Sequence, residues 1–314
     1  MKKGRIEALV IGCGNIGAMY DLESKDILTH SKAISENENF NLTVYDTDPM
    51  RSDLVSKFYK CRKLDDIEDI GFYNIVSICT PTNAHFGLLN KLFSLNIPLI
   101  ICEKPISNNN DELELLRIDY AKSSTNVLVN YFRRFQPSFI DLKNEIKSIL
   151  ENDKLVNVNV KYQRGFLNNC SHAIDLLEFV LGQIIDFKNF TLAEVLYDSF
   201  EDDPTVSMFG TSNDVFYSFT GLTKVKYSFF EIELFFGDSA IKIEESGNLI
   251  KYFKNSFNQS FFMPLVEEKV VRSAIRYRMK HVIDKSEDIF IRKDQDNFLV
   301  SLDLNQRMLS VLNK

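Results

Sequence analysis

The sequence predicts two domains: an α/β domain with a doubly wound parallel sheet over residues 1–130, and an α+β domain with an open, mostly antiparallel sheet over residues 131–314. Short runs rich in Val, Ile and Leu alternate with amphipathic stretches in the first part, which is typical of βαβ units. After Pro137 the runs alternate polar with apolar residues and become rich in Phe and Tyr, which indicates antiparallel strands. A chain of 314 residues also suits two domains better than one.

In the first domain the apolar runs are short and rich in Val, Ile and Leu, as buried parallel strands are. The expected strands are Ile6–Ile11, Phe40–Tyr45, Asn74–Cys79, Pro98–Cys102 and Asn126–Val129. Among the stretches between them, Ala84–Leu95 repeats its apolar residues at helical spacing, which predicts a helix packed against the sheet.

The second domain is expected to begin with a helix over Ser138–Leu150, a strand over Leu155–Tyr162 and a helix over His172–Leu181. Period-2 runs separated by short polar breaks then predict a sheet. These runs are Ile184–Leu196, Thr205–Thr211, Val215–Leu222, Lys224–Phe235 and Ala240–Ile243. The tail Asn297–Leu312 has a helical pattern again.

Composition excludes several classes of protein. A formal net charge of −7 disfavours binding to nucleic acids or anionic membranes, since both are polyanions. The five cysteines are scattered without a C-x-x-C pair, so we expect no metal site and a reducing cytoplasm. The basic N-terminus runs into a short strand-like segment, so we expect neither a signal peptide nor a membrane span.

The strongest single motif is Gly12-Cys13-Gly14-Asn15-Ile16-Gly17, a G-x-G-x-x-G directly after the first strand. In a Rossmann domain the first glycine permits the tight turn, the second lets the backbone approach a pyrophosphate, and the third lets helix and strand pack closely. The helix that follows is expected to present unpaired N–H groups to the phosphates. The alternative is a plain glycine-rich turn.

The second strand ends at Asp46, whose carboxylate suits an adenosine ribose and would repel a 2′-phosphate. This favours NAD as cofactor. Asp46 lies further from Gly17 than is usual, which requires an insertion, placed at Asp21–Ile27. Two alternatives remain open: a turn aspartate without a ligand, and NADP bound with the help of Arg51.

Four further groups of residues follow in order along the chain. They are Ile78-Cys79-Thr80-Pro81-Thr82-Asn83-Ala84-His85, Cys102-Glu103-Lys104-Pro105, Asn130-Tyr131-Phe132-Arg133-Arg134-Phe135 and the stretch Asn168–Asp175. With the glycine motif, they resemble the glucose–fructose oxidoreductase / inositol dehydrogenase (Gfo/Idh/MocA) family. The resemblance implies NAD(P)-dependent hydride transfer at a carbinol carbon of a sugar, nucleotide sugar or cyclitol, and dimers or tetramers joined through the C-terminal sheet.

The resemblance also implies which residues line the cofactor. They are Thr80, Pro81, Asn83 and His85, with a structural role for His85 itself, together with Glu103 and Lys104. An ammonium at Lys104 would stabilise developing alkoxide charge as hydride leaves. Spacing alone would favour a surface lysine in a turn.

The same resemblance implies that His172 acts as acid, base or proton shuttle, as suits an imidazole that titrates near neutrality. The alternative is a hydrogen-bonded histidine near a helix start. Asp175, one turn on, would orient His172 or the lysine. The family usually has Asp where this chain has Asn168, and an amide takes no proton at neutral pH. Three interpretations remain open. Lys104 and His172 are sufficient for catalysis, another group takes the place of the family's Asp carboxylate, or the protein has lost its activity.

Other polar residues are expected to bind substrate in the second domain, and they suit a polyhydroxylated or nucleotide-linked sugar. They are Arg133, Arg134, Tyr162, Arg164, Asn168 and Asn169. For the two arginines, interdomain salt bridges are an equal explanation. The apolar run Phe229–Phe236 predicts a sheet–sheet oligomer interface, with ordinary core as the alternative.

The sequence therefore predicts a cytoplasmic sugar or cyclitol dehydrogenase. A dinucleotide-binding sensor without turnover is the rival from another class, supported by Asn168. A reductase of an imine or a tetrapyrrole is the rival among enzymes, because related folds host such reactions.

Overall fold

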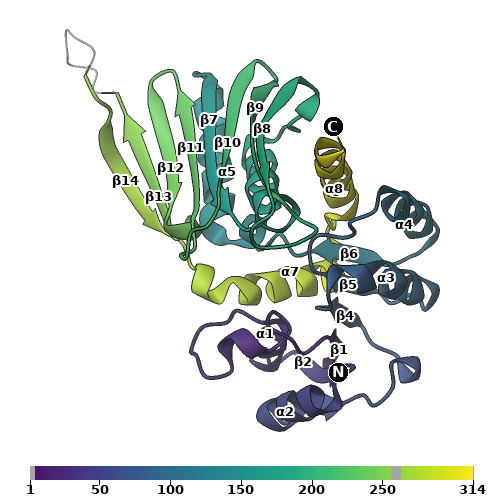
Figure 1. Ribbon diagram of the computed structural model, residues 1–314. Coiled ribbons are helices and arrows are strands. Elements are labelled where there is room, and N and C mark those ends of the chain that lie inside the picture. Colours follow the sequence, from purple (N-terminus) through teal and green to yellow (C-terminus); the bar gives the residue numbers. More distant parts are fainter. Residues whose placement is uncertain (1–3, 256–262, 314) are drawn as a thin grey trace. The chain divides into compact units, whose positions relative to one another are not determined.

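The structure is a computed structural model that describes residues 4–255 and 263–313. It divides into two compact units (Figure 1). The first unit comprises Met1–Phe132 and Arg276–Leu309, and the second comprises Arg133–Ile275 and Ser310–Lys314. The second domain was expected to run to the C-terminus, whereas residues 276–309 join the first unit.

Long-range hydrogen bonds explain this difference. The side chain of Asn305 accepts the backbone N–H of Ile106 at 2.9 Å, and that of Asn297 accepts the N–H of Val129 at 2.8 Å. Both contacts join the C-terminal segment to loops or strands of the first unit. No local sequence pattern indicates such a pairing, because the partners lie more than a hundred residues apart.

The first unit contains a six-stranded parallel sheet in the order β3-β2-β1-β4-β5-β6. Its strands are β1 (Ile6–Ile11), β2 (Phe40–Tyr45), β3 (Arg62–Lys63), β4 (Ile75–Ile78), β5 (Leu99–Cys102) and β6 (Asn126–Val129). Its helices are α1 (His30–Ser35), α2 (Pro49–Tyr59), α3 (His85–Ser94), α4 (Asn110–Lys122), α7 (Arg278–Arg292) and α8 (Phe298–Leu312). The chain order reverses beside β1, as in doubly wound folds.

The second unit contains an eight-stranded sheet in the order β14-β13-β12-β11-β7-β10-β9-β8. Its strands are β7 (Leu155–Gln163), β8 (Phe190–Leu196), β9 (Thr205–Ser212), β10 (Val215–Leu222), β11 (Phe230–Phe236), β12 (Ser239–Glu244), β13 (Leu249–Lys254) and β14 (Val266–Arg272). All neighbouring pairs are antiparallel except β7 and β10, so the expected fold class is confirmed.

Two of the expected strands in this sheet were too long. The run Ile184–Leu196 becomes a strand only at Phe190, because Asp186 caps a short 3₁₀ turn by accepting the N–H of Lys188 at 3.0 Å. The run Lys224–Phe235 pairs only from Phe230 onward, and Lys224 itself has φ +59°. The strands β13 and β14 and the helix α7 were not expected from the sequence.

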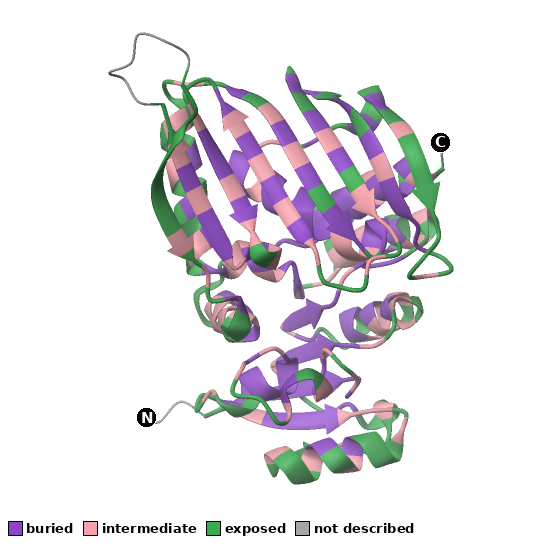
Figure 2. Cartoon of the chain, turned by 60° about the vertical axis from the view of Figure 1, so that its left-hand side comes forward, coloured by how far each residue is buried: buried purple, intermediate pink, exposed green. Residues whose placement is uncertain are grey.

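Two helices, α5 (Pro137–Leu150) and α6 (Ser171–Leu181), pack against each other and against one face of this sheet. Figure 2 shows buried residues alternating with less buried ones along its strands, as expected where one face is covered. In β11 the side chains of Phe230, Ile232 and Leu234 are buried, which accounts for the apolar run Phe229–Phe236. Within the described residues, no helix is long and apolar enough to cross a membrane.

Candidate functional site

The residues expected to bind a cofactor gather at one edge of the parallel sheet. Gly12 directly follows β1, Asp46 follows β2 and Glu103 follows β5, while Thr80 lies two residues beyond β4. Because these strands are parallel, their carboxyl ends share one edge, where open α/β sheets bind ligands.

The three glycines of the loop differ in what surrounds them. Gly12 has φ +96°, and a Cβ on Gly17 would lie 1.9 Å from the carbonyl oxygen of Gly12. A Cβ on Gly14, in contrast, would meet nothing within 4 Å. Packing within the protein therefore requires the first and third glycines, whereas the second borders open space. This is the arrangement expected where a pyrophosphate approaches the backbone.

The helix expected after this loop is interrupted. One turn forms, in which the N–H of Ala18 bonds the carbonyl of Gly14 at 2.9 Å, and α1 begins only at His30. Asp21 holds the intervening segment, because its buried carboxylate accepts the N–H and the hydroxyl of Thr29 at 2.8 and 2.7 Å. The segment placed as an insertion, Asp21–Ile27, thus separates this first turn from α1.

The single turn still leaves donors for an anion. Among the described residues, the backbone N–H groups of Asn15, Ile16 and Gly17 donate to no protein acceptor. Exposed N–H groups of this kind at the start of a helical turn attract phosphate oxygens. The loop therefore fits a dinucleotide pyrophosphate, although it lacks the dipole of a long helix.

Asp46 joins the second strand to the glycine loop. One carboxylate oxygen accepts the N–H of Cys13 at 2.7 Å and the other accepts the N–H of Asp48 at 2.8 Å. A carboxylate has about four lone-pair positions, so acceptor capacity remains for a ribose hydroxyl. Arg51 lies between two carboxylates, 3.5 Å from Asp46 and 3.6 Å from Asp48.

The turn after β4 contains a second set of candidate residues. The ring of His85 lies 3.0 Å from the carbonyl of Thr80 and 2.9 Å from that of Pro105. Burial lowers the pKa of His85, so the ring is neutral at pH 7 and donates its single N–H to one of these two carbonyls. The hydroxyl of Thr80 is buried and, among the described residues, has no partner. Pro81 and Asn83 belong to the same turn.

Glu103 is buried beside Lys104 and has two side-chain partners. The Nε2 atom of His30 lies 3.0 Å from its carboxylate, and the amide of Asn130 donates to the same oxygen. Burial by itself would raise the pKa of Glu103, but the hydrogen bonds from His30 and Asn130 and the charge of Lys104 lower it overall. Glu103 is therefore ionised next to the Lys104 ammonium.

Sequence reasoning missed both partners of Glu103. Asn130 directly follows β6, so its position at the carboxyl edge of the sheet was a signal that could have found it. His30 begins α1 after the inserted segment, and no spacing rule connects it with Glu103.

In the second unit, His172 and Asp175 lie in the first turns of α6 and are both buried. The carboxylate of Asp175 receives two bonds from the guanidinium of Arg134, one from Nε at 3.1 Å and a shorter one from Nη2. Burial raises the pKa of Asp175 to about 6, although the charge of Arg134 opposes this rise. The carboxyl group of Asp175 is thus hydrogen-bonded to Arg134 through both of its oxygens.

Arg133 is also engaged inside this unit. Its guanidinium donates to the carbonyl of Ser246 at 3.1 Å and stacks over the ring of Phe230 at 3.9 Å. Tyr162 lies in the core, where its hydroxyl donates to the carbonyl of Val206 at 2.7 Å. Of the expected substrate-binding residues, Arg133, Arg134 and Tyr162 therefore already have structural contacts within this unit.

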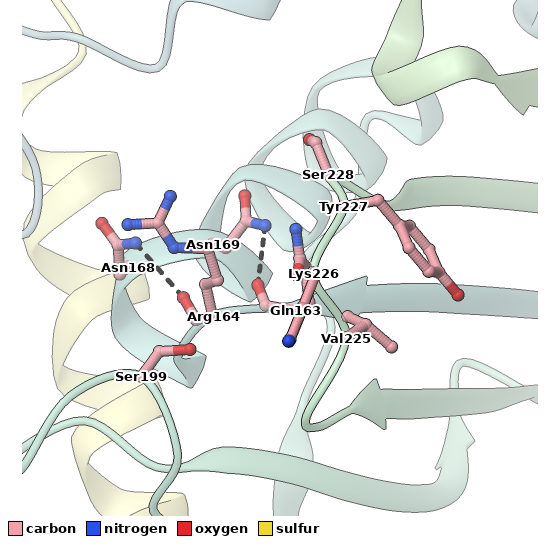
Figure 3. Close-up of a pocket in the computed structure, with 9 residues that line it drawn as sticks. All are labelled: Gln163, Arg164, Asn168, Asn169, Ser199, Val225, Lys226, Tyr227 and Ser228. Atoms are coloured by element: carbon pink, nitrogen blue, oxygen red, sulfur yellow. Dashed lines mark hydrogen bonds between the residues drawn. The ribbon is translucent and has the colours of Figure 1, made fainter.

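A pocket of about 480 Å³ opens where β7 ends, and it brings together three of the expected substrate-binding residues, Arg164, Asn168 and Asn169 (Figure 3). Gln163, Arg164, Asn168 and Asn169 line it, together with five residues that the sequence did not indicate. Those five are Ser199, Val225, Lys226, Tyr227 and Ser228. In Figure 3 the side chains of Arg164 and Asn168 lie next to each other, and the ring of Tyr227 points away from them.

The loop that carries Arg164 has unusual backbone angles. Arg164 has φ +62° and Gly165 has φ +85°, and a Cβ on Gly165 would lie 2.1 Å from the carboxylate of Asp203. That buried carboxylate accepts the N–H groups of Leu167 and Asn168, both at 2.8 Å. A left-handed arginine costs about 1 kcal/mol, and such strain concentrates at functional sites.

Comparisons with known proteins agree with this fold. Residues 6–132 match the model of the GFO_IDH_MocA family, described as an oxidoreductase family with an NAD-binding Rossmann fold. Inositol 2-dehydrogenase of Rhizobium meliloti (strain 1021) is 29% identical over 190 residues, which are 55% of this chain and 54% of that protein. The chain thus spans about half the length of this curated relative.

Two solved structures share the whole fold. A myo-inositol dehydrogenase from Corynebacterium glutamicum ATCC 13032 superposes with a TM-score of 0.72 at 13% identity, covering 98% of this chain and 96% of its own. An oxidoreductase from Agrobacterium radiobacter in complex with NAD⁺, L-tartaric acid and magnesium has a TM-score of 0.74 at 13% identity, with coverages of 98% and 94%. Among the described residues of this chain, no cluster of His, Cys, Asp and Glu side chains suits a metal ion.

Proposed function

The chain belongs to the Gfo/Idh/MocA family of oxidoreductases, as its motifs predicted, and from this premise we propose that it is a dehydrogenase of CH–OH groups. It transfers a hydride between a nicotinamide dinucleotide and a secondary hydroxyl or ketone of a sugar, nucleotide sugar or cyclitol. The observation that carries the proposal is the edge of the parallel sheet, where the glycine loop, Asp46 and the Glu103–Lys104 pair follow three of its strands.

NAD is the proposed cofactor, and the nicotinamide supplies the hydride acceptor or donor. The loop N–H groups from Asn15 to Gly17 bind the pyrophosphate, and Asp46 accepts a ribose hydroxyl. Arg51 lies beside Asp46 and Asp48, so its charge is already balanced by two carboxylates. This arrangement supports NAD over NADP, because Asp46 repels a 2′-phosphate.

Lys104 is proposed to bind the reacting oxygen. Its ammonium stabilises the alkoxide that develops when hydride leaves the carbon, which is the electrostatic contribution that a fixed cation makes best. Glu103 supports this role, because its buried carboxylate is held by His30 and Asn130 and is ionised beside Lys104 in the sequence.

His172 is proposed to exchange the hydroxyl proton. Imidazole suits this task near neutral pH. Asn168 takes no proton, and Asp175 is bound by Arg134, so neither completes a relay with it. In this proposal Lys104 and His172 both act on the reacting hydroxyl, and Asp175 orients α6.

We further propose a cytoplasmic homo-oligomer joined through the sheet face that α5 and α6 leave uncovered. Phe209 and Phe216 support this, because both side chains are exposed and their rings lie 6.4 Å apart on neighbouring strands. Sedimentation velocity on the purified protein would measure its oligomeric state.

The test is titration with NADH and NADPH by fluorescence, followed by turnover on free, phosphorylated and nucleotide-linked sugars and on myo-inositol. Lys104→Met and His172→Ala are each expected to lower kcat by about 10²- to 10⁴-fold while NADH binding survives. Lys122→Met and His281→Ala, which change residues outside the proposed site, serve as matched controls. NADH binding without turnover on any substrate would favour the sensor that Asn168 suggests, and absence of dinucleotide binding would refute the proposal.

A further inference from the structure

The pocket at the end of β7 is positively charged. Arg164 and Lys226 both line it, and no carboxylate side chain is among the nine lining residues. The other lining residues are mostly amides and hydroxyls, with Val225 as the single aliphatic side chain. This composition is unusual for a chain in which acidic residues outnumber basic ones, 44 to 37.

Neither cation is neutralised by the protein. Among the described residues, Arg164 and Lys226 take part in no ion pair. Other cations of the same unit do, as when Lys242 lies 2.9 Å from Glu233 and Lys251 lies 2.7 Å from Glu244. Two cations that share a concave site repel each other, and an anion bound there would relieve this repulsion.

Arg164 is also held in place. Its guanidinium lies 5.7 Å from the ring centroid of Phe200, and its carbonyl accepts the amide of Asn168 at 3.2 Å. The loop around it is fixed by the buried carboxylate of Asp203, which accepts two backbone N–H groups. A guanidinium positioned in this way suits bidentate binding of a carboxylate or phosphate.

We propose that this pocket binds an anionic group of the substrate, a phosphate or a carboxylate, through Arg164 and Lys226. The preferred substrate is then a phosphorylated, nucleotide-linked or acidic sugar, and a neutral cyclitol is a poor one. This inference rests on the proposed function in one respect: Asn168 lines the pocket and lies four residues, about one turn, before His172.

The test measures binding directly, so that it does not depend on turnover. The NADH-loaded protein is titrated by calorimetry with glucose, glucose 6-phosphate, glucuronate and UDP-glucose. At least one anionic sugar is expected to bind at least about tenfold more tightly than glucose. Arg164→Gln and Lys226→Gln are each expected to weaken that binding by about 10- to 100-fold, because each removes a charge-assisted hydrogen bond. The phosphate and carboxylate arms identify which anion the pocket prefers.

Two controls make the result specific. Lys224→Gln removes a charge from the same loop but outside the pocket, and it is expected to leave binding unchanged. Arg164→Lys keeps the positive charge but removes the guanidinium that can bind an anion through two parallel N–H groups. Its binding is expected to lie between that of the wild type and that of Arg164→Gln. Equal binding of glucose and all three anionic sugars, no detectable binding of any anionic sugar, or equal effects of Lys224→Gln and Lys226→Gln would overturn the inference. If the wild type binds an anionic sugar, the pocket variants lose this binding, and no hydride transfer is detected, the inference about the pocket stands and the dehydrogenase proposal is refuted.

Discussion

The two units build their candidate sites in different ways. In the first unit the site combines the backbone of the glycine loop with side chains such as those of Asp46 and Glu103, and its residues directly follow strands β1, β2 and β5. In the second unit the pocket is made of side chains from three separate segments, 163–169, 199 and 225–228, held by the buried carboxylate of Asp203. A site whose residues directly follow strands is encoded locally, whereas a pocket made from separate segments depends on which distant segments fold together.

The buried carboxylates of the two units show the same contrast. Burial would raise the pKa of Glu103, but donors from His30 and Asn130 and the neighbouring Lys104 lower it overall. For Asp175 burial prevails over the charge of Arg134, and nearby Glu178 adds to the rise. The first unit therefore stabilises its charge near the proposed site, whereas the second keeps a carboxyl that titrates close to neutrality.

The largest effect is expected from a methyl group in the glycine loop. In Gly17→Ala the new Cβ would lie 1.9 Å from the carbonyl oxygen of Gly12, and backbone cannot yield as a side chain can. We expect a loss of more than about 3 kcal/mol in the free energy of unfolding, measured by urea denaturation.

Gly14→Ala is the matched variant, because its Cβ enters open space. Its free energy of unfolding should change by less than about 1 kcal/mol. NADH affinity should nevertheless fall by about tenfold or more, which is about 1.4 kcal/mol, since the methyl group occupies the approach to the pyrophosphate. Normal NADH binding by Gly14→Ala would show that the loop is only a structural turn.

The fold was largely predictable from the sequence where patterns are local. Five strands of the parallel sheet were predicted to within a residue of their observed ends, because each is a short run rich in Val, Ile and Leu. Prediction failed where a polar cap or a left-handed residue delays the start of a strand, as at Asp186 before β8 and Lys224 before β11. It also failed for α7, whose place beside the parallel sheet depends on contacts distant in sequence.

The same distinction between local patterns and distant contacts applies to the candidate site residues. The residues from Gly12 to Gly17, Asp46 and Lys104 were named from motifs, and the structure places them at one edge of the parallel sheet. Lys226 was not predicted as a site residue, because the sequence pattern around it predicts a strand and because it lies 62 positions after Arg164. No pattern within either segment indicates that the two cations share a pocket.

The next effect sharpens the contrast between the two buried carboxylates. The pKa of Asp175 is about 6 in the folded protein against an ordinary value of 3.8. Between about pH 4 and 6 the folded state keeps a proton that the unfolded state releases, so the wild type loses stability as pH rises through this window. With 1.36 kcal/mol for each pKa unit, the loss is about 3 kcal/mol.

Asp175→Asn imitates the protonated carboxyl and does not titrate. The stability of the wild type relative to this variant should therefore fall from pH 4 to 6 and stay level above, measured by urea denaturation at each pH. Asp214→Asn, an exposed carboxyl in the turn between β9 and β10, should keep the pH dependence of the wild type. A difference between wild type and Asp175→Asn that does not vary with pH would contradict the raised pKa.

The smallest effect concerns the choice of dinucleotide, and it tests whether the first site recognises charge as well as backbone shape. Asp46→Asn removes the negative charge that repels a 2′-phosphate, while one oxygen remains to accept the N–H of Cys13. The ratio of NADH to NADPH affinity should fall by about tenfold, or 1.4 kcal/mol, measured by fluorescence titration. Asp48→Asn neutralises the other carboxylate beside Arg51 and should leave the ratio unchanged, because it caps α2 rather than facing the loop. If both variants shift the ratio equally, the preference reflects the charge around Arg51, and the role proposed for Asp46 is wrong.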